Sequence, residues 1–359
     1  MDKPPLRILT SCSIWQGAAD YGLLRALRRA GHSVTNLPDS DFIPNWRTPW
    51  LRAARRLLRP VLAAEYRRAL LQAARELKPD VFLAYKGTYV DAEAVAAIGR
   101  SGAVTLAILP DVSFTIHGPI IPRALPVFDW VFTTKSFGPG DLAREIGVTR
   151  ASFLPHCFDP ETHHPVTLDA RDAQLYACHA AFIGAWSPKK EALLTLARPR
   201  LAGLDVKIWG ARWEQASKAL APLIMKRPVF GQEYAKAVTG AKINIALLTE
   251  AMGEASSGDL TTTRTFEIPA IGGFMLHERN AEAQALFAEG AECAMFSSGE
   301  DLAEKILYYL AHDEERRRIA AAGRARCLDS GYSADARIAS ILHKARELMR
   351  SRRAKDDAS

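Results

Sequence analysis

The stretch 259–278, DLTTTRTFEIPAIGGFMLHE, places an arginine and two carboxylates around a run of three threonines and ahead of a glycine pair. Threonine is a good N-cap residue, and a helix start offers free backbone N–H groups to an anion. Arg264 adds a planar cation suited to phosphate, and Glu267, one turn later, can accept two hydrogen bonds from a vicinal diol such as a ribose. The pattern therefore indicates recognition of a nucleotide-sugar. The candidate residues for binding it include Thr261, Thr262 and Thr263.

The same spacing has a second interpretation. The threonines would then only cap a helix, Arg264 and Glu267 would pair at i,i+3 on a solvated face, and the glycine pair would end the helix. Spacing alone leaves both interpretations open.

Two longer segments carry a family resemblance. RTFEIPAIGGFMLHERNAEAQALF and EDLAEKILYYLAHDEERRRIAAAGRARCL resemble the C-terminal half of the CgeB-like (spore maturation protein-like) glycosyltransferases, which are related to retaining family-four enzymes of the GT-B fold. In those relatives two acids separated by seven residues bracket this helix start, and Asp259 and Glu267 have that spacing. The resemblance implies that Glu267 binds the ribose of the donor nucleotide and that Asp259 lies near the donor sugar.

The resemblance also implies a clamp for the donor diphosphate. Related enzymes place an arginine and a lysine in and after the loop that follows the first strand of the second domain. Here Ala185 takes the arginine position, so Arg264 with Lys189 or Lys190 is expected to neutralise the phosphates, and neither a metal nor another cofactor is expected. Further donor-binding candidates are glycines after predicted strands: Gly17, Gly184, Gly210 and Gly231.

In the N-terminal half, polar residues follow predicted strands. Ligands of open α/β sheets bind at the carboxyl ends of strands, where the KGTY segment and Asp111 lie. The resemblance extends more loosely to KGTY and LPDVSF, and it implies that Asp111, with His117 as substitute, lies beside the donor sugar. The alternatives are that Asp111 caps a helix, that His117 fills a loop and that Gly17 forms an ordinary turn.

Alternating strand and helix patterns predict an α/β protein with two Rossmann-like doubly wound domains, facing each other across a cleft as in the GT-B architecture. The length of 359 residues suits two domains. We expect an acceptor domain over 1–158, a linker over 159–178, a donor domain over 179–333, a helix over 334–350 that packs back across both, and a disordered tail over 351–359. Shorter elements are expected too: a loop over 185–190 before a helix from Glu191, and a strand over 229–231.

Basic residues concentrate in 47–78, predicted as two helical segments broken at Pro60. This stretch has nine Lys and Arg against two Asp and Glu, a surplus equal to the net charge of +7 of the whole chain. The stretch could rest on an anionic membrane, receive a negatively charged acceptor or form a solvated helix. No nucleic-acid-binding motif accompanies the charge.

The five cysteines are widely spaced and lack a C-x-x-C motif, so we expect neither a disulfide framework nor a zinc cluster, and we expect the cysteines to be buried. His156, His163 and His164 lie in a proline-rich loop and do not suggest a metal site. No long apolar run or signal-peptide pattern is present, which predicts a cytoplasmic protein, possibly on the inner face of the membrane.

The leading hypothesis is transfer of a sugar from a nucleotide-diphosphate donor to an acceptor such as a saccharide, a lipid-linked molecule or a small molecule, with retention of configuration. One rival is a nucleotide-sugar epimerase on the same scaffold. The other is a basic, membrane-associated protein that binds nucleotide-sugar without turning it over.

Overall fold

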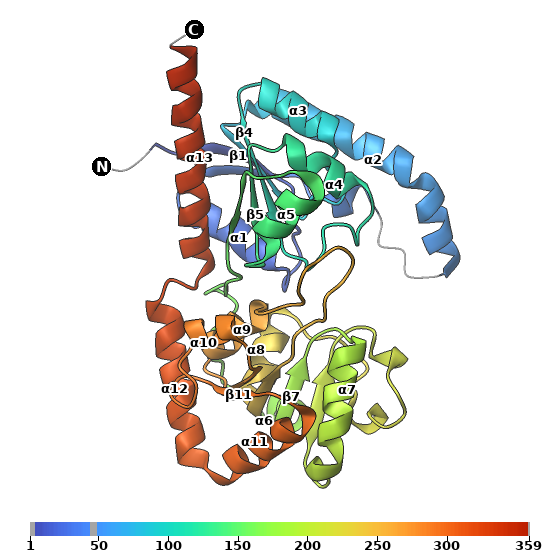
Figure 1. The fold of residues 1–359 in the computed structure, drawn as a ribbon, viewed down its shortest axis with the longest axis vertical. Coiled ribbons are helices and arrows are strands. Elements are labelled where there is room, and N and C mark those ends of the chain that lie inside the picture. The colour runs from blue at the N-terminus through green and yellow to red at the C-terminus, as the bar shows by residue number, and fades with distance from the viewer. Residues whose placement is uncertain (1–3, 44–48, 358–359) are drawn as a thin grey trace. The chain divides into compact units, whose positions relative to one another are not determined.

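The computed structural model describes residues 4–43 and 49–357, which form two compact units (Figure 1). The first unit comprises Met1–Pro155, the short segment Met252–Ser256 and the C-terminal Asp335–Ser359. The second comprises His156–Ala251 and Ser257–Ala334. The chain thus passes from the first unit to the second after Pro155, whereas the sequence suggested residue 158.

A six-stranded sheet, ordered β2-β1-β3-β4-β5-β6, forms the centre of the first unit. All its strand pairs are parallel. The carboxyl ends of these strands therefore share one edge, as a ligand-binding α/β sheet requires. The strands are β1 (Arg7–Thr10), β2 (Ser33–Asn36), β3 (Val81–Tyr85), β4 (Val104–Leu109), β5 (Trp130–Thr133) and β6 (Ala151–Phe153).

Helices cover both faces of this sheet. Alternate strand residues, including Leu9, Phe82 and Ala107, pack against one helical layer, because neighbouring side chains of a strand point to opposite faces. That layer contains α2, α3 and α4, and Figure 1 shows α1 and α13 on the opposite side. The helices are α1 (Ala19–Arg29), α2 (Pro49–Leu77), α3 (Ala92–Arg100), α4 (Ile120–Ala124), α5 (Gly138–Ile146) and α13 (Ala334–Asp356).

Two helices of the first unit differ from expectation. α2 is one helix with Pro60 inside it, not two segments. The buried residues Tyr66, Leu70 and Ala74 recur every four positions and anchor its C-terminal half, so one hydrogen bond lost at a proline does not end the helix.

The other difference is that α13 continues to Asp356, through most of the segment expected to be a disordered tail. Arg352 fixes this end through two hydrogen bonds to Asp129, at 2.7 and 2.6 Å. This charge-assisted, bidentate contact gives the chain end a defined place.

The second unit contains a five-stranded sheet in the order β11-β10-β9-β7-β8, again entirely parallel. Two parallel sheets covered by helices confirm the predicted α/β class. The strands are β7 (Cys178–Ile183), β8 (Val206–Trp209), β9 (Ala241–Ala246), β10 (Met275–Glu278) and β11 (Ala294–Phe296).

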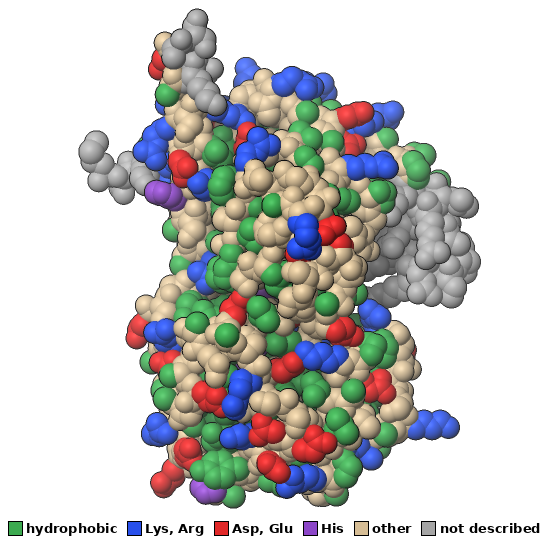
Figure 2. Space-filling model, viewed as in Figure 1, with side chains coloured by type: hydrophobic (Ala, Val, Ile, Leu, Met, Phe, Trp, Pro, Cys, Tyr) green, Lys and Arg blue, Asp and Glu red, His purple; other side chains and the backbone are tan. Residues whose placement is uncertain are grey.

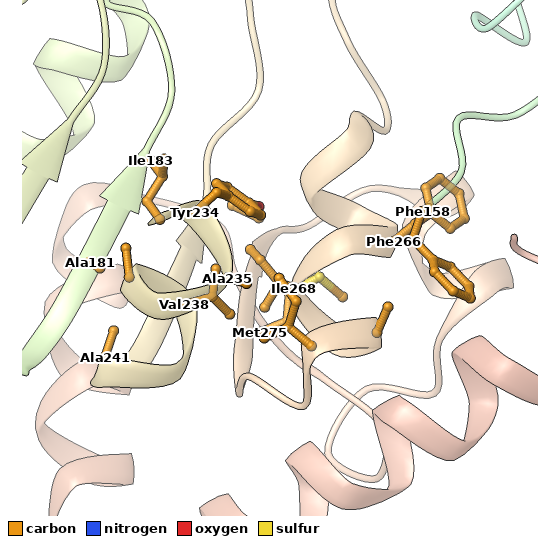
Figure 3. Close-up of a cluster of buried hydrophobic side chains, with 14 of the residues drawn as sticks. Phe158, Ala181, Ile183, Tyr234, Ala235, Val238, Ala241, Phe266, Ile268 and Met275 are labelled. Carbon is orange, nitrogen blue, oxygen red and sulfur yellow. The ribbon is translucent and has the colours of Figure 1, made fainter. Parts of the chain in front are cut away.

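Two hydrophobic clusters hold this sheet between its helices. On one face, Ala181 and Ile183 of β7 and Met275 of β10 pack with Tyr234 and Phe266 (Figure 3). On the other face, Phe182 and Leu276 pack with residues of α7 and α11. The helices are α6 (Ala170–Tyr176), α7 (Pro188–Ala197), α8 (Gly231–Gly240), α9 (Thr263–Ile271), α10 (Ala281–Leu286), α11 (Gly299–Ala311) and α12 (Asp313–Asp329).

Three local expectations change in the second unit. Residues 229–231 form no strand, because Gly231 begins α8. Lys189 and Lys190 belong to the first turn of α7, not to the loop before it, since Pro188 suits the first helical position. The segment expected as a linker, 159–178, contains α6 and the buried Tyr176, and it lies in the second unit.

No helix in the described part of the chain combines the length and hydropathy needed to cross a bilayer. Of the five cysteines, Cys157 is half-buried and the other four are buried, so the expectation of burial is wrong only for Cys157.

Candidate functional site

The N-terminus of α9 is built by its own threonines. Thr262 is the N-cap residue, and its backbone N–H donates to Thr265 Oγ1 at 3.0 Å. Thr261 donates its hydroxyl to Glu282 at 2.6 Å. Thr261 and Thr262 are buried, whereas Thr263, the first residue of the helix, is half-buried. The threonines therefore stabilise the start of the helix. The groups that could bind an anion there are the backbone N–H groups of the first turn.

A buried histidine supports this helix start from β10. His277 Nδ1 lies 2.7 Å from the carbonyl oxygen of Glu278, which can only accept, so Nδ1 carries the proton. His277 Nε2 then accepts the hydroxyl of Thr265 at 2.9 Å. Burial lowers the pKa of His277 to about 4. The neutral imidazole thus completes a chain of hydrogen bonds that ends at the N-cap.

Arg264 projects from the first turn of α9 toward the loop after β7. Its Nη2 donates to the carbonyl oxygen of Leu247 at 2.8 Å, and its guanidinium carbon lies 5.4 Å from the ring centre of Phe182. Arg264 Nε is buried and has no hydrogen-bond partner among the described residues. A buried donor without a partner is costly, which favours a ligand that accepts from this side chain.

Lys190 provides a second cation beside Arg264, and this one is buried. Its Nζ donates to the carbonyl oxygen of Ala185 at 3.2 Å and to Thr249 Oγ1 at 3.0 Å. Burial, followed by the charge of Arg264, lowers the pKa of Lys190 to about 8. Across the described residues, neither Lys190 nor Arg264 forms an ion pair with a carboxylate. Lys189, by contrast, pairs with Glu278.

Two of the expected acidic residues lie near these cations. Thr249 links Asp259 to Lys190, because its backbone N–H donates to Asp259 Oδ2 at 3.3 Å while its hydroxyl accepts from Lys190. Glu267 lies one turn beyond Arg264 on α9, and its Oε1 is 3.7 Å from His163 Nε2. Glu267 also raises the pKa of the buried Tyr234, although burial is the larger cause.

His163 and Tyr234 were not anticipated as neighbours of Glu267. Their rings meet edge-on with centres 5.8 Å apart. His163 precedes the second sheet in the chain and Tyr234 lies on α8, so no local spacing links either residue to α9.

The candidate glycines have different roles. Gly210 has a φ of +149°, and a Cβ there would lie 1.9 Å from the carbonyl oxygen of Gly184, so the two loops meet closely. Gly231 has a φ of +54° at the start of α8. Gly17 has a φ of +108° between β1 and α1, in the first unit. Gly184 lies against a predicted donor-binding side chain, that of Arg264.

In the first unit, residues after β3 and β4 form a charged cluster. Asp111 Oδ2 lies 3.0 Å from both Lys86 Nζ and His117 Nε2. Burial raises the pKa of Asp111, but the hydrogen bond from His117 and the charge of Lys86 outweigh it and lower the pKa to about 2. The structure thus brings Asp111 and His117 together. Lys86 also contacts Asp111, whereas the sequence predicted only that both residues lie at the same edge of the sheet.

Residues of the loop after Asp111 donate hydrogen bonds to the carboxylate of Glu254, which comes from a distant segment of the chain. Glu254 accepts hydrogen bonds from Ser113 Oγ at 2.7 Å and from the backbone N–H of Phe114 at 2.9 Å. Ser256 donates its backbone N–H to Asp141 at 2.9 Å. The segment Met252–Ser256 is thereby bound within the first unit.

No group of three or more His, Cys, Asp or Glu side chains that could hold a metal ion occurs within residues 4–43 and 49–357. His163, one of the histidines considered above, lies against Glu267 instead.

A family match covers most of the second unit. Residues 187–343 match the model of a protein family described as Glycosyl transferase-like. The matched range includes Lys190, Asp259, Arg264 and Glu267. No curated protein matches the chain.

Solved structures match nearly the whole chain. A glycosyltransferase from Rickettsia africae is similar with a TM-score of 0.66 and 12% identity, over 97% of this chain and 99% of that one. Anabaena HepE in complex with UDP and glucose has a TM-score of 0.63 and 13% identity, over 95% and 100%. UDP-GlcNAc 2-epimerase from Neisseria meningitidis bound to UDP-GlcNAc has a TM-score of 0.56 and 12% identity, over 95% and 100%. The two Rossmann-like domains therefore have the fold of GT-B glycosyltransferases.

Proposed function

We propose that this protein is a glycosyltransferase that moves a sugar from a nucleotide-diphosphate donor to an acceptor. The observation that carries the proposal is a pair of cations, the buried Lys190 and the half-buried Arg264 with its buried Nε. Among the described residues, they bind backbone carbonyls and a hydroxyl but no carboxylate. Buried charges are normally paired. A diphosphate placed here would supply the missing negative charge.

The chemistry of transfer explains why these cations suit the reaction. As the glycosidic bond lengthens, negative charge builds up on the leaving phosphate, and positive groups fixed in advance around it lower the barrier. Arg264, Lys190 and the N-terminus of α9 supply such groups in the second unit. Hydrogen bonds to Leu247 and Ala185 hold both side chains in place, so little reorganisation is needed.

We assign the sugar parts of the donor to the neighbouring acids. Glu267 would accept hydrogen bonds from the ribose hydroxyls, with His163 beside it fixing the carboxylate. Asp259 would lie near the donor sugar, as the CgeB-like resemblance implies. Retention of configuration extends the proposal on the same resemblance, and NMR assignment of the product anomer tests it. A reaction without metal extends the proposal because Arg264 and Lys190 would neutralise the phosphates.

The Asp111 cluster of the first unit is proposed to contact the reacting sugar or the acceptor. Asp111 stays ionised at neutral pH, since its pKa is lowered to about 2, so it would act as a hydrogen-bond acceptor or stabilise positive charge. His117, bonded to Asp111, would hold or move a proton at Nε2.

Calorimetric titration with UDP, UDP-glucose and other nucleotide sugars tests the donor site. We expect Arg264→Ala and Glu267→Ala each to lose most donor affinity or turnover while the melting temperature stays close to that of the wild type. Matched controls in the same unit are Arg200→Ala and Glu304→Ala, because these residues form an exposed ion pair. Unchanged donor binding in both Arg264→Ala and Glu267→Ala would contradict the proposal.

An epimerase is the second candidate, favoured by the similarity of fold to the Neisseria meningitidis enzyme. Epimerisation needs acids and bases around the sugar but no acceptor. Incubation with a single nucleotide sugar separates the two activities: an isomerised sugar still attached to its nucleotide indicates an epimerase, whereas glycoside formed only when acceptor is added indicates a transferase.

The third candidate is a membrane-associated protein that binds nucleotide-sugar without turnover, favoured by the basic stretch 47–78. Residues 44–48 lie outside the described chain, as do several side chains of α2. The test is binding to vesicles of phosphatidylcholine with phosphatidylglycerol, before and after neutralising Arg52, Arg55, Arg56 and Arg59. Loss of vesicle binding together with absent donor turnover would favour this candidate.

A further inference from the structure

The helix α13 carries a row of basic residues in the first unit, apart from the Asp111 cluster. His343, Arg346, Arg350 and Arg353 are three or four positions apart. Residues at this spacing lie on one face of a helix. These four side chains and the apolar residues Leu6 and Met349 line a cavity of about 420 Å³, here named the α13 pocket.

Two hydrogen bonds shape the α13 pocket. Arg346 Nη2 donates to the carbonyl oxygen of Pro4 at 3.3 Å, just before β1, and Arg350 Nε donates to the carbonyl oxygen of Arg346 at 3.3 Å. Each guanidinium has five N–H donors in a fixed fork, so these contacts orient the side chains and leave donors for a ligand. The pocket therefore lies where the chain enters β1, at the amino edge of the sheet.

Among the described residues, the basic side chains of the α13 pocket have no carboxylate in direct contact, and Glu347 acts on His343 and Arg350 through charge at longer range. Within the described residues, no carboxylate forms an ion pair with any of its basic side chains, and the nearby Glu347 pairs with Lys344 at 2.8 Å. Figure 2 shows lysine and arginine side chains gathered over this part of α13. The helix dipole favours cations only in the last turn, which accounts for Arg353 but not for Arg346. Like charges at this spacing repel, so an anion placed among them would stabilise the helix.

The position of α13 is fixed independently of this row. Arg352, on another face of the helix, binds Asp129 and the carbonyl oxygen of Ala103. The basic side chains are thus presented from a rigid support, which lowers the entropy cost of binding a ligand.

We propose that the α13 pocket binds a phosphate-bearing ligand, with the guanidinium groups of Arg346, Arg350 and Arg353 on the phosphate and Leu6 and Met349 against an apolar part. Arginine forks match the oxygens of phosphate in a bidentate manner. This site is separate from the diphosphate site proposed between α7 and α9, and it does not depend on that function. The phosphate belongs either to a free small molecule or to the headgroup of a lipid.

Calorimetry with inorganic pyrophosphate tests the proposal on the full-length protein. The variant Arg346→Gln/Arg350→Gln/Arg353→Gln is expected to lose about ten-fold or more in affinity at the α13 pocket, since each arginine contributes charge-assisted hydrogen bonds. A control, Arg198→Gln/Lys218→Gln/Lys226→Gln, removes the same charge from exposed positions of the second unit. The background Arg264→Ala removes pyrophosphate binding at the donor site, so the two sites are measured separately.

Vesicles of phosphatidylcholine, with and without phosphatidylglycerol, distinguish the source of the phosphate. Vesicle binding that the α13 variant loses assigns a lipid headgroup, and pyrophosphate binding without vesicle binding assigns a free ligand. The proposal is overturned if the α13 variant binds pyrophosphate and vesicles as the wild type does, or if the control variant loses as much. Circular dichroism and melting temperature establish that both variants fold.

Discussion

Gly184 and Arg264 are in close contact in the second unit: a Cβ built on Gly184 would lie 2.8 Å from Arg264 Nη1. The same Cβ would lie 2.8 Å from the Phe182 ring, over which the guanidinium rests. Contacts this short require a shift of the side chain. The absence of a side chain at Gly184 therefore leaves room for the arginine that is proposed to bind the donor phosphate.

Replacing Gly184 by alanine should displace the Arg264 side chain and also lower stability, because the added carbon meets both the end of the arginine and the fully buried Phe182 ring. We expect the Kd for UDP to rise about ten-fold or more, equivalent to about 1.4 kcal/mol. Calorimetry measures the affinity, and a thermal melt measures stability.

The control for this substitution is Gly290→Ala in a turn where nothing lies within 4 Å of the added carbon. Its positive φ of +79° makes it strained, so it should lower stability but not UDP affinity. Equal UDP affinity in Gly184→Ala and the wild type would show that the space is not needed for binding.

Donor binding should weaken as pH rises through about 8, the lowered pKa of Lys190. Below this pH the lysine is charged and can pair with phosphate; above it the free protein has lost the proton, and binding must restore it. Titrations with UDP between pH 7 and about 9.5 would measure the slope.

Lys190→Met should bind UDP more weakly at pH 7, by about 1.5–3 kcal/mol, and should lose the pH dependence. Lys189→Met serves as the control, because Lys189 pairs with Glu278. In this variant the plot of UDP affinity against pH should keep its inflection near pH 8. A persistent inflection near pH 8 in Lys190→Met would exclude Lys190 as its source.

Asp111→Asn should lower turnover more than donor affinity, because Asp111 lies in the first unit with Lys86 and His117. It should also lower stability at pH 7 by about 1–2 kcal/mol, after allowance for solvent screening. The folded pKa, about 2, lies below the ordinary value of 3.8. The stability difference from wild type should therefore be full above pH 4 and shrink as pH falls toward 2.

Urea unfolding at several pH values measures that difference, and kinetics with varied donor separates KM from kcat. Glu93→Gln is the matched control, since the Glu93 side chain is 80% exposed in its pair with Arg67. A difference that stays constant down to pH 2 would remove the ionised Asp111 cluster as the source of stability.

Acid should destabilise the second unit through His277. Its folded pKa, about 4, lies below the ordinary value of 6.5, so the unfolded chain binds more protons between these values and stability falls as pH falls through them. The loss for this group is at most about 3 kcal/mol.

His277→Gln cannot gain that proton, so its unfolding free energy should fall less than that of the wild type between pH 6.5 and 4.5. Urea unfolding followed by tryptophan fluorescence measures both proteins, and comparing each with itself across pH removes any constant effect of the substitution. Parallel curves would show that another group causes the acid loss.

Sequence alone determined much of the architecture, because its information is local. Strand and helix periodicity, and glycines after strands, predicted two parallel-sheet domains. The threonines before Arg264 likewise predicted the start of α9 within one or two residues, since capping depends on adjacent residues.

Local patterns failed where burial outweighed propensity. Pro60 did not end α2, because Tyr66, Leu70 and Ala74 fix the helix in the core. The C-terminal segment became helical, because Arg352 meets Asp129 from a distant part of the chain. Asp129 is 223 residues from Arg352 in the chain, so no local pattern links the two.

The contacts of the candidate site were decided by tertiary structure. The sequence identified Gly184, Lys190, Arg264 and Glu267 as residues of suitable chemistry, but not that Gly184 makes room for Arg264 or that His163 lies against Glu267. Residue type and spacing describe what a side chain can do, whereas its neighbours, burial and pKa depend on which strands lie side by side in the folded sheet.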